Sequence, residues 1–131
     1  MAQVTLNRIL LIEDDVDIQA ITKMALETTG GFTVQVCSSG KEAIEKAPVF
    51  KPDIILLDVM MPQMDGPTVL KALREISEAK SVPVVFLTAR SPPREIERLK
   101  KIGVVDIILK PFDPMTIAEK VKNIWDRLSE R

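Results

Sequence analysis

The stretch IILLDVMMPQMDG, at residues 54–66, decides the fold. Four consecutive apolar residues run into the acid Asp58, and Pro62 and Gly66 then mark a loop before the next amphipathic segment. An uninterrupted apolar run of this length is typical of a central strand in a parallel sheet that helices cover on both faces. The stretch therefore predicts a buried strand at 54–57, a loop over 58–66, and a helix beyond it.

Further apolar runs, at residues 9–12, 34–37, 84–87 and 107–109, repeat this arrangement along the chain. Longer segments with apolar residues at helical spacing separate them, which is the pattern of βα units around a parallel sheet. At 131 residues the chain is long enough for one core and too short for a second of similar size. We therefore expect five βα units in a single domain over residues 1–131.

The helical segments carry some finer expectations. Ile21 and Ile102 fall at positions that predict burial, the first in the segment after residues 9–12 and the second before the last strand. Pro48 should close the second helix, because proline lacks the amide hydrogen that a helix interior needs. Ser91 and the two prolines after it suit the start of the fourth helix.

The composition excludes several classes of function. The chain has 18 basic and 19 acidic side chains, no histidine and a single cysteine, Cys37. A net charge of −1 gives no general attraction to nucleic acid or to anionic lipid, and no apolar run approaches the length of a membrane span. Without histidine or a cysteine cluster, any metal should be a hard ion with oxygen ligands. The sequence thus favours a cytoplasmic protein that binds neither nucleic acid nor membranes directly.

Polar residues follow four of the apolar runs: Glu13 and Asp14, then Asp58, Thr88 and Lys110. In a parallel sheet these termini share one edge, which is where ligands of open α/β sheets bind. Each residue alone has an ordinary explanation, as a helix cap, a turn residue or a solvated amine. Together they predict a site at which acids, a hydroxyl and an amine converge.

Convergent carboxylates need a compensating charge. Two like charges repel by about 4 kcal/mol when about 4 Å apart at an effective dielectric constant of about 20. Mg²⁺, or the similarly hard Mn²⁺, would offset that repulsion, with the adjacent acids Glu13 and Asp14 well arranged to hold the ion. Asp58 is then the candidate nucleophile for a phosphoryl group, Thr88 and Lys110 are partners for its oxygens, and Ala89 leaves space beside it. We expect Asp15, the next acid, to cap a helix.

At this point the residues resemble a known family, the receiver domains of bacterial two-component response regulators, which have the CheY-like fold. The resemblance covers the chain from about Asn7 to Leu128. It implies a doubly wound (βα)₅ sheet of flavodoxin-like topology with strand order 2-1-3-4-5. The matching segments are Glu13-Asp14, residues 58–66, Thr88-Ala89 and Lys110-Pro111-Phe112.

The resemblance also implies roles. Asp58 would take a phosphoryl group from the phosphohistidine of a sensor kinase or phosphotransfer protein, so the chain would catalyse only its own phosphorylation and dephosphorylation. Mg²⁺ would be held by Glu13, Asp14, Asp58 and the backbone carbonyl of Met60. The peptide bond before Pro111 would be cis. Because the partner brings the histidine, its absence here fits this scheme.

The chain departs from the family's pattern in two ways. Three residues before the lysine, members usually carry an aromatic residue that turns inward as the threonine moves, whereas this chain has Ile107. Met60 and Arg90 flank the place where a hydrolytic water would enter, and Met60 cannot orient that water. We therefore expect a long-lived phosphoryl-aspartate, the alternative being that Met60 and Arg90 both point to solvent and have no effect. We also expect a modified switch, in which Ile107 either packs behind Thr88 or acts only as a strand residue.

Two enzyme or cofactor-binding families fit the same residues less well. A haloacid-dehalogenase-type phosphatase usually has a second aspartate where this chain has Met60, and a flavodoxin has a glycine- and hydroxyl-rich first loop rather than an acidic one. A receiver-like interaction domain that works without phosphate stays open. Output is expected through the face formed by the Ser91–Ile102 helix, the last strand and the last helix, toward a downstream protein, an effector domain or a second copy. No effector domain is recognised, and the sequence does not distinguish a stand-alone receiver from a fragment.

Overall fold

The computed structural model of the chain describes residues 5–89 and 92–129. Strands and helices alternate along these residues without exception. The strands are β1 (Arg8–Ile12), β2 (Thr33–Cys37), β3 (Ile54–Asp58), β4 (Val84–Ala89) and β5 (Asp106–Lys110). The helices are α1 (Val16–Gly30), α2 (Gly40–Phe50), α3 (Gly66–Arg74), α4 (Pro93–Lys100) and α5 (Ile117–Ser129).

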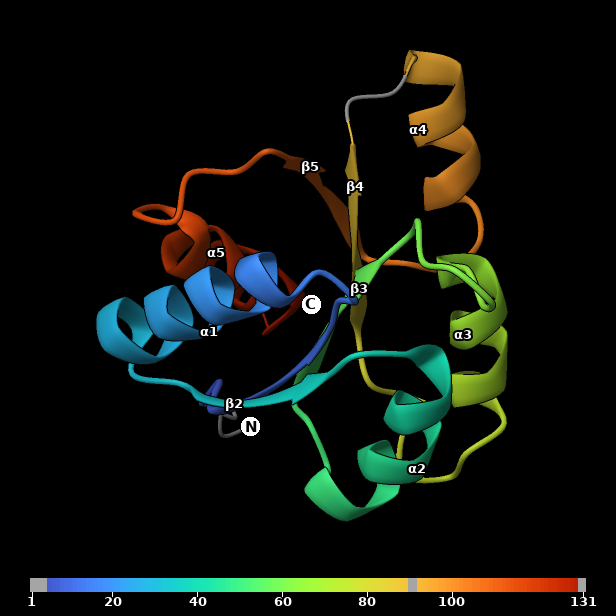
Figure 1. The fold of residues 1–131 in the computed structure, drawn as a ribbon, viewed down its shortest axis with the longest axis horizontal. Helices are drawn as coiled ribbons and strands as arrows, with labels where there is room; N and C mark the ends of the chain where they lie inside the picture. The colour runs from blue at the N-terminus through green and yellow to red at the C-terminus, as the bar shows by residue number, and fades with distance from the viewer. Residues whose placement is uncertain (1–4, 90–91, 130–131) are drawn as a thin grey trace.

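The five strands form one parallel sheet in the order β2-β1-β3-β4-β5, which confirms the expected topology. Helices α1 and α5 cover one face of this sheet, and α2, α3 and α4 lie on the other side (Figure 1). Strand β3 is at the centre and all of its residues are buried, as its apolar sequence predicts. Alternate residues of β1 enter the two cores: Ile9 and Leu11 join the α1/α5 side, while Leu10 and Ile12 join the α2/α3 side.

Side-chain caps set where three of the helices begin. The Asp15 carboxylate accepts the amides of Asp17 and Ile18 at the start of α1, which confirms its expected capping role. Ser39 and Asp65 cap α2 and α3 in the same way. Because each capped helix starts directly after a strand's carboxyl end, the caps determine how the intervening loops lie along the edge of the sheet.

Helix α2 does not end at Pro48. It continues through that residue to Phe50, and Lys51 caps it in a left-handed conformation. Contacts with β1 hold the extra turn, because Arg8 Nε donates to the Phe50 carbonyl at 2.8 Å and the guanidinium lies 4.1 Å from the centre of the Phe50 ring. Tertiary contacts therefore outweigh the loss of one helical hydrogen bond at the proline.

Two expected core residues are exposed. Ile21 is 51% exposed, because the buried residues of α1 are Thr22 and Leu26 instead. Ile102 also lies largely at the surface, since α4 ends at Lys100 and leaves this residue in the following turn. Ser91 lies outside the described residues. Among the residues that are described, no helix is both long and apolar enough to cross a membrane.

Candidate functional site

The structure brings the polar strand ends together at one edge of the sheet. Asp58 is the last residue of β3 and pairs in register with Leu87, so Thr88 follows directly beside it. Lys110 is the last residue of β5 and lies opposite Ala89. Glu13 follows β1 immediately, and its amide donates to the Cys37 carbonyl of β2 at 3.0 Å. Parallel register alone therefore accounts for the convergence that the sequence predicts.

Lys110 bridges the two buried acids of this edge. Its ammonium Nζ lies 2.6 Å from Glu13 Oε1 and 3.2 Å from Asp58 Oδ2. Glu13 is only 1% exposed and Asp58 only 4% exposed, so both carboxylates have lost most of their contact with water. Among the described residues, one cation thus serves two desolvated anions, so these side chains together carry a net negative charge.

The pKa values at this edge follow from burial and charge. Burial raises the pKa of the Glu13 carboxyl, and the hydrogen bonds from Lys110 and from the Asp15 amide offset that rise only in part. For Lys110 the balance is the reverse. Burial works against the charged amine, but the hydrogen bond that the amine donates to Glu13 and the charge of Asp58 outweigh burial and raise the Lys110 pKa. The raised pKa keeps Lys110 cationic, whereas burial destabilises the ionised form of the Glu13 carboxyl.

A third acid completes a group that fits a hard metal ion. Carboxylate oxygens of Glu13, Asp14 and Asp58 all lie within 4.8 Å of one another. Glu13 Oε2 also accepts the Asp15 amide at 3.1 Å, and Asp58 Oδ1 accepts the Met60 amide at 3.2 Å, which holds both side chains in place. Because all the donors are oxygens, the set suits Mg²⁺ and not a soft transition metal.

The remaining candidates lie around this group. Thr88 is buried at the end of β4, and Ala89, next to it, is exposed. Ile107 on β5 is partly buried against the core shared with α3 and α4. Met60 is 73% exposed, so its side chain is free to meet a solvent molecule that approaches Asp58. Arg90 lies outside the described residues.

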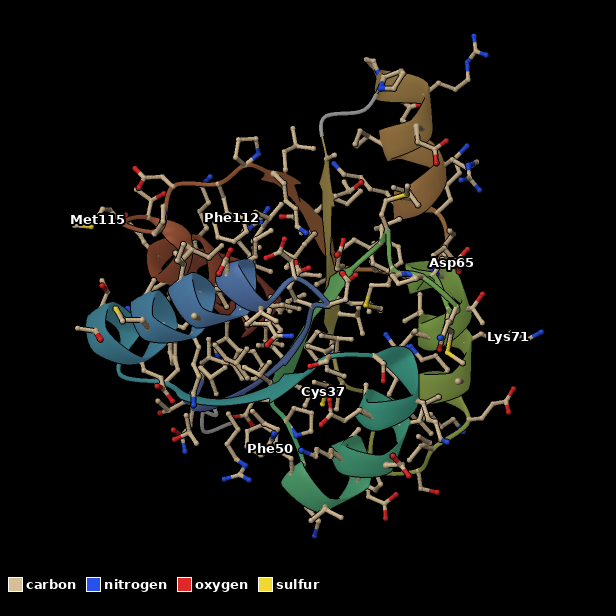
Figure 2. The ribbon with its side chains drawn as sticks, viewed as in Figure 1. Cys37, Phe50, Asp65, Lys71, Phe112 and Met115 are labelled. Carbon is tan, nitrogen blue, oxygen red and sulfur yellow. The ribbon has the colours of Figure 1, made fainter. Side chains whose placement is uncertain are left out.

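The turn after β5 is tightly constrained. The Lys110–Pro111 peptide bond is cis. Phe112 then packs partly buried against the core between α1 and α5 (Figure 2). Met115, further along the same turn, points outward to solvent in that view. The packing of Phe112 thus holds the backbone that follows Lys110.

Comparison with known proteins identifies the family. The family model of the response regulator receiver domain matches residues 9–122. The chain belongs to this family. Phosphorylation-based signalling is the general function of receiver domains, and such domains bind Mg²⁺ in an acidic pocket of the kind described above.

The relatives of this receiver domain are regulatory proteins. The probable C4-dicarboxylate response regulator DctR of Halalkalibacterium halodurans is 39% identical over 113 residues, which are 86% of this chain and 48% of that protein. The alkaline phosphatase synthesis transcriptional regulatory protein PhoP of Bacillus subtilis is 36% identical over 121 residues, 92% of this chain and 49% of that protein. The receiver domain therefore spans about half the length of these relatives.

Solved structures agree with the fold. The chemotaxis protein CheY4 of Vibrio cholerae superimposes with a TM-score of 0.82 at 29% identity, covering 92% of this chain and 99% of that one. A putative response regulator from Chloroflexus aurantiacus gives a TM-score of 0.82 at 29% identity, covering 94% of this chain and 100% of that one. Both comparisons extend over nearly the whole receiver domain.

Two features beside the site were not anticipated from the sequence. An apolar groove of about 400 Å³ runs between α1 and the turn after β5, and Lys110 and Pro111 form part of its wall. Exposed Ile21 lines it, although helical spacing alone had predicted burial for this residue. The second feature is Gln19 of α1, whose amide donates to the Glu13 carbonyl. Gln19 belongs to no sequence motif, because its side-chain hydrogen bonds join residues distant in the sequence, including Ser38 in the loop after β2.

Proposed function

We propose that this receiver domain accepts a phosphoryl group on Asp58 from the phosphohistidine of a sensor kinase or a phosphotransfer protein. The observation that carries the proposal is the position of Lys110 Nζ, 3.2 Å from Asp58 Oδ2 and 2.6 Å from Glu13 Oε1 at a largely buried edge. An ammonium in this place lowers the repulsion that an incoming phosphoryl group meets from two carboxylates.

In the transfer, an Asp58 carboxylate oxygen forms a bond to phosphorus while the bond from phosphorus to the donor's imidazole nitrogen breaks. The imidazole leaves with that electron pair and takes up a proton. Lys110 neutralises charge on the transferred group, the Thr88 hydroxyl donates a hydrogen bond to it, and the small side chain of Ala89 leaves room. The chain contains no histidine, so the donor is another protein or domain.

In the same proposal, Mg²⁺ is held by Glu13, Asp14, Asp58 and the Met60 carbonyl. A bound Mg²⁺ supplies charge neutralisation at the transferring phosphoryl oxygens. It also relieves the repulsion among the carboxylates in the resting protein. We therefore expect millimolar Mg²⁺ to raise the melting temperature of the wild type and to have little effect on Asp14→Asn; an equal shift in both would contradict the assignment of Asp14.

Intact mass after incubation with acetyl phosphate and Mg²⁺ tests the transfer. We expect the mass to rise by one phosphoryl group in the wild type and to stay unchanged in Asp58→Asn, whose amide cannot act as the acceptor. Thr88→Ala should still be modified, because its hydroxyl assists but does not receive the group. A wild type that stays unmodified, with Mg²⁺ bound, would favour the alternative function of a receiver-like interaction domain that works without phosphate.

The proposed output is a change in protein association. Phosphorylation adds about −1.5 to −2 charges beside the ends of β4 and β5. The face made by α4, β5 and α5 is continuous with these strands, and it presents the exposed apolar residues Val105 and Leu109. A downstream protein, an effector domain or a second copy of the chain would read the phosphorylated state there. Residues 1–131 would act as one regulatory domain in this process.

A further inference from the structure

The side chain of Gln19 joins three parts of the fold beside the acidic site. Its Nε2 donates to the backbone carbonyl of Glu13 at 2.5 Å and to Ser38 Oγ at 3.1 Å. Gln19 belongs to the first turns of α1, Glu13 follows β1, and Ser38 follows β2. The side-chain amide of Gln19 therefore links helix α1 to the acidic turn after β1 and to the loop after β2.

The Ser38 end of this link is itself firmly held. The Ser38 amide donates to Glu42 Oε1 at 2.6 Å, and Glu42 forms an ion pair with Lys46 at 3.0 Å along α2. The Ser38 amide, and then Lys46, lower the pKa of the Glu42 carboxyl, so it stays an anionic acceptor at neutral pH. Ser38, the second hydrogen-bond partner of Gln19, is thus anchored to α2 through Glu42.

The Glu13 end determines where the next acid points. A peptide group is planar, so the position of the Glu13 carbonyl oxygen also sets the Asp14 amide and the Asp14 Cα. The Glu13 carboxylate has its own partners, Lys110 and the Asp15 amide. Among the described residues, the Asp14 carboxylate has no hydrogen-bond or ion-pair partner, so its placement depends on the backbone.

We propose that Gln19 is a positioning residue for the acidic site: its amide orients the Glu13–Asp14 peptide group so that the Asp14 carboxylate stands ready for a divalent cation. This inference rests on the proposed function, because it gives Asp14 a part in binding Mg²⁺. Gln19 touches neither the cation nor the phosphoryl group and acts only through the backbone of the turn.

Substitution with methionine tests the proposal, since methionine has nearly the shape of glutamine but cannot donate a hydrogen bond. Gln35→Met is the matched control: Gln35 is also partly buried, and its Nε2 donates to the Val36 carbonyl at 3.0 Å, away from the acidic turn. A calorimetric titration with Mg²⁺ alone should give a dissociation constant about tenfold higher for Gln19→Met than for the wild type. The constant for Gln35→Met should be close to that of the wild type.

A second measurement needs no metal. Hydrogen exchange of the Asp14 and Asp15 amides in metal-free protein should be faster in Gln19→Met than in the wild type and unchanged in Gln35→Met. Ser38→Ala removes only one of the two acceptors of the Gln19 amide, so it should give a smaller change in both measurements. It replaces Gln19→Met as the test variant if Gln19→Met does not fold. Equal Mg²⁺ affinity in Gln19→Met and the wild type would overturn the proposal.

The two measurements also separate this inference from the proposed function. If the wild type binds no Mg²⁺, the metal site fails, and exchange of the Asp14 amide in the metal-free variants then decides the role of Gln19. Unchanged exchange in both Gln19→Met and Ser38→Ala would overturn the positioning role, whether or not Asp58 accepts phosphate.

Discussion

At the level of single residues, the described part of the site pairs one cation, Lys110, with the acids Glu13, Asp14 and Asp58. Lys110 contacts Glu13 and Asp58, both of which are nearly inaccessible to water. Burial of an ion pair gives little net stability, but removal of one partner leaves a desolvated charge without compensation. The amine that, in the proposed function, prepares Asp58 for a phosphoryl group therefore also compensates the buried charges of the unphosphorylated domain.

We expect Lys110→Met to lower the free energy of unfolding by about 3 kcal/mol at pH 7 in metal-free buffer. The loss should shrink as the pH falls. A carboxyl whose pKa is raised in the folded state, as for Glu13, opposes folding above its folded pKa, and that penalty disappears below its unfolded value, which is about 4.3. Urea unfolding at several pH values measures this, with Lys110→Arg, which keeps a cation, as the control. A loss that does not change between pH 7 and pH 4 would contradict the electrostatic cause.

Met60 gives a prediction about the lifetime of the phosphorylated state. Its exposed apolar side chain stands two residues after Asp58 and cannot orient an attacking water, so hydrolysis of the phosphoryl-aspartate should be slow. We expect Met60→Asn to lose labelled phosphate several-fold faster than the wild type, because an amide can hold the water by hydrogen bonds. Met60→Leu is the control and should decay like the wild type. A wild type that already decays as fast as Met60→Asn would contradict the idea.

At the level of elements, strand sequences were easier to interpret than helix sequences. An apolar run such as 54–57 has few alternatives, and parallel register then places Asp58, Thr88 and Lys110 at one edge. Helix details depend on partners that are distant in the chain. The turn beyond Pro48 is held by a strand residue, and the exposure of Ile21 follows from how α1 lies against the turn after β5. For the same reason the sequence did not predict the contacts of Gln19, because its partner Ser38 lies on another loop.

The junction between β3 and α3 gives a prediction at this scale. Gly66 is buried at the start of α3, and an added Cβ would lie 2.9 Å from the Val59 Cα and 3.3 Å from the Phe86 ring. The backbone atom cannot move aside easily, so Gly66→Ala should lower the free energy of unfolding by about 2 kcal/mol. Lys71→Ala, on the same helix with its side chain pointing to solvent in Figure 2, should change it by less than about 0.5 kcal/mol. Urea unfolding of both variants provides the comparison, and equal stability would show that the junction is looser than these distances imply.

At the level of the whole molecule, two different surfaces lie near the same acid, one beside α1 and one around the β5 edge of the sheet. The α1 side carries the apolar groove whose wall includes Lys110. The α4, β5 and α5 side carries exposed Val105 and Leu109, together with the ion pair between Arg127 and Asp106 that ties α5 to β5. Asp58, at the end of the central strand, forms an ion pair with Lys110, which lines the groove and is also the last residue of β5. A change in charge at one residue can therefore be read on a face that does not include it.

Association of the phosphorylated domain tests which face is the output. We expect sedimentation velocity to show a larger species after treatment with acetyl phosphate and Mg²⁺, because phosphorylation should make the α4, β5 and α5 face self-complementary. Leu109→Asp places a charge on that face and should stay monomeric while its intact mass still rises by one phosphoryl group. Val49→Asp adds the same charge at an exposed apolar position of α2 and should associate like the wild type. If phosphorylated Leu109→Asp associates to the same extent as the wild type, the interface does not lie on this face. If the wild type stays monomeric when fully phosphorylated, the face does not mediate self-association, and its partner would be a different protein.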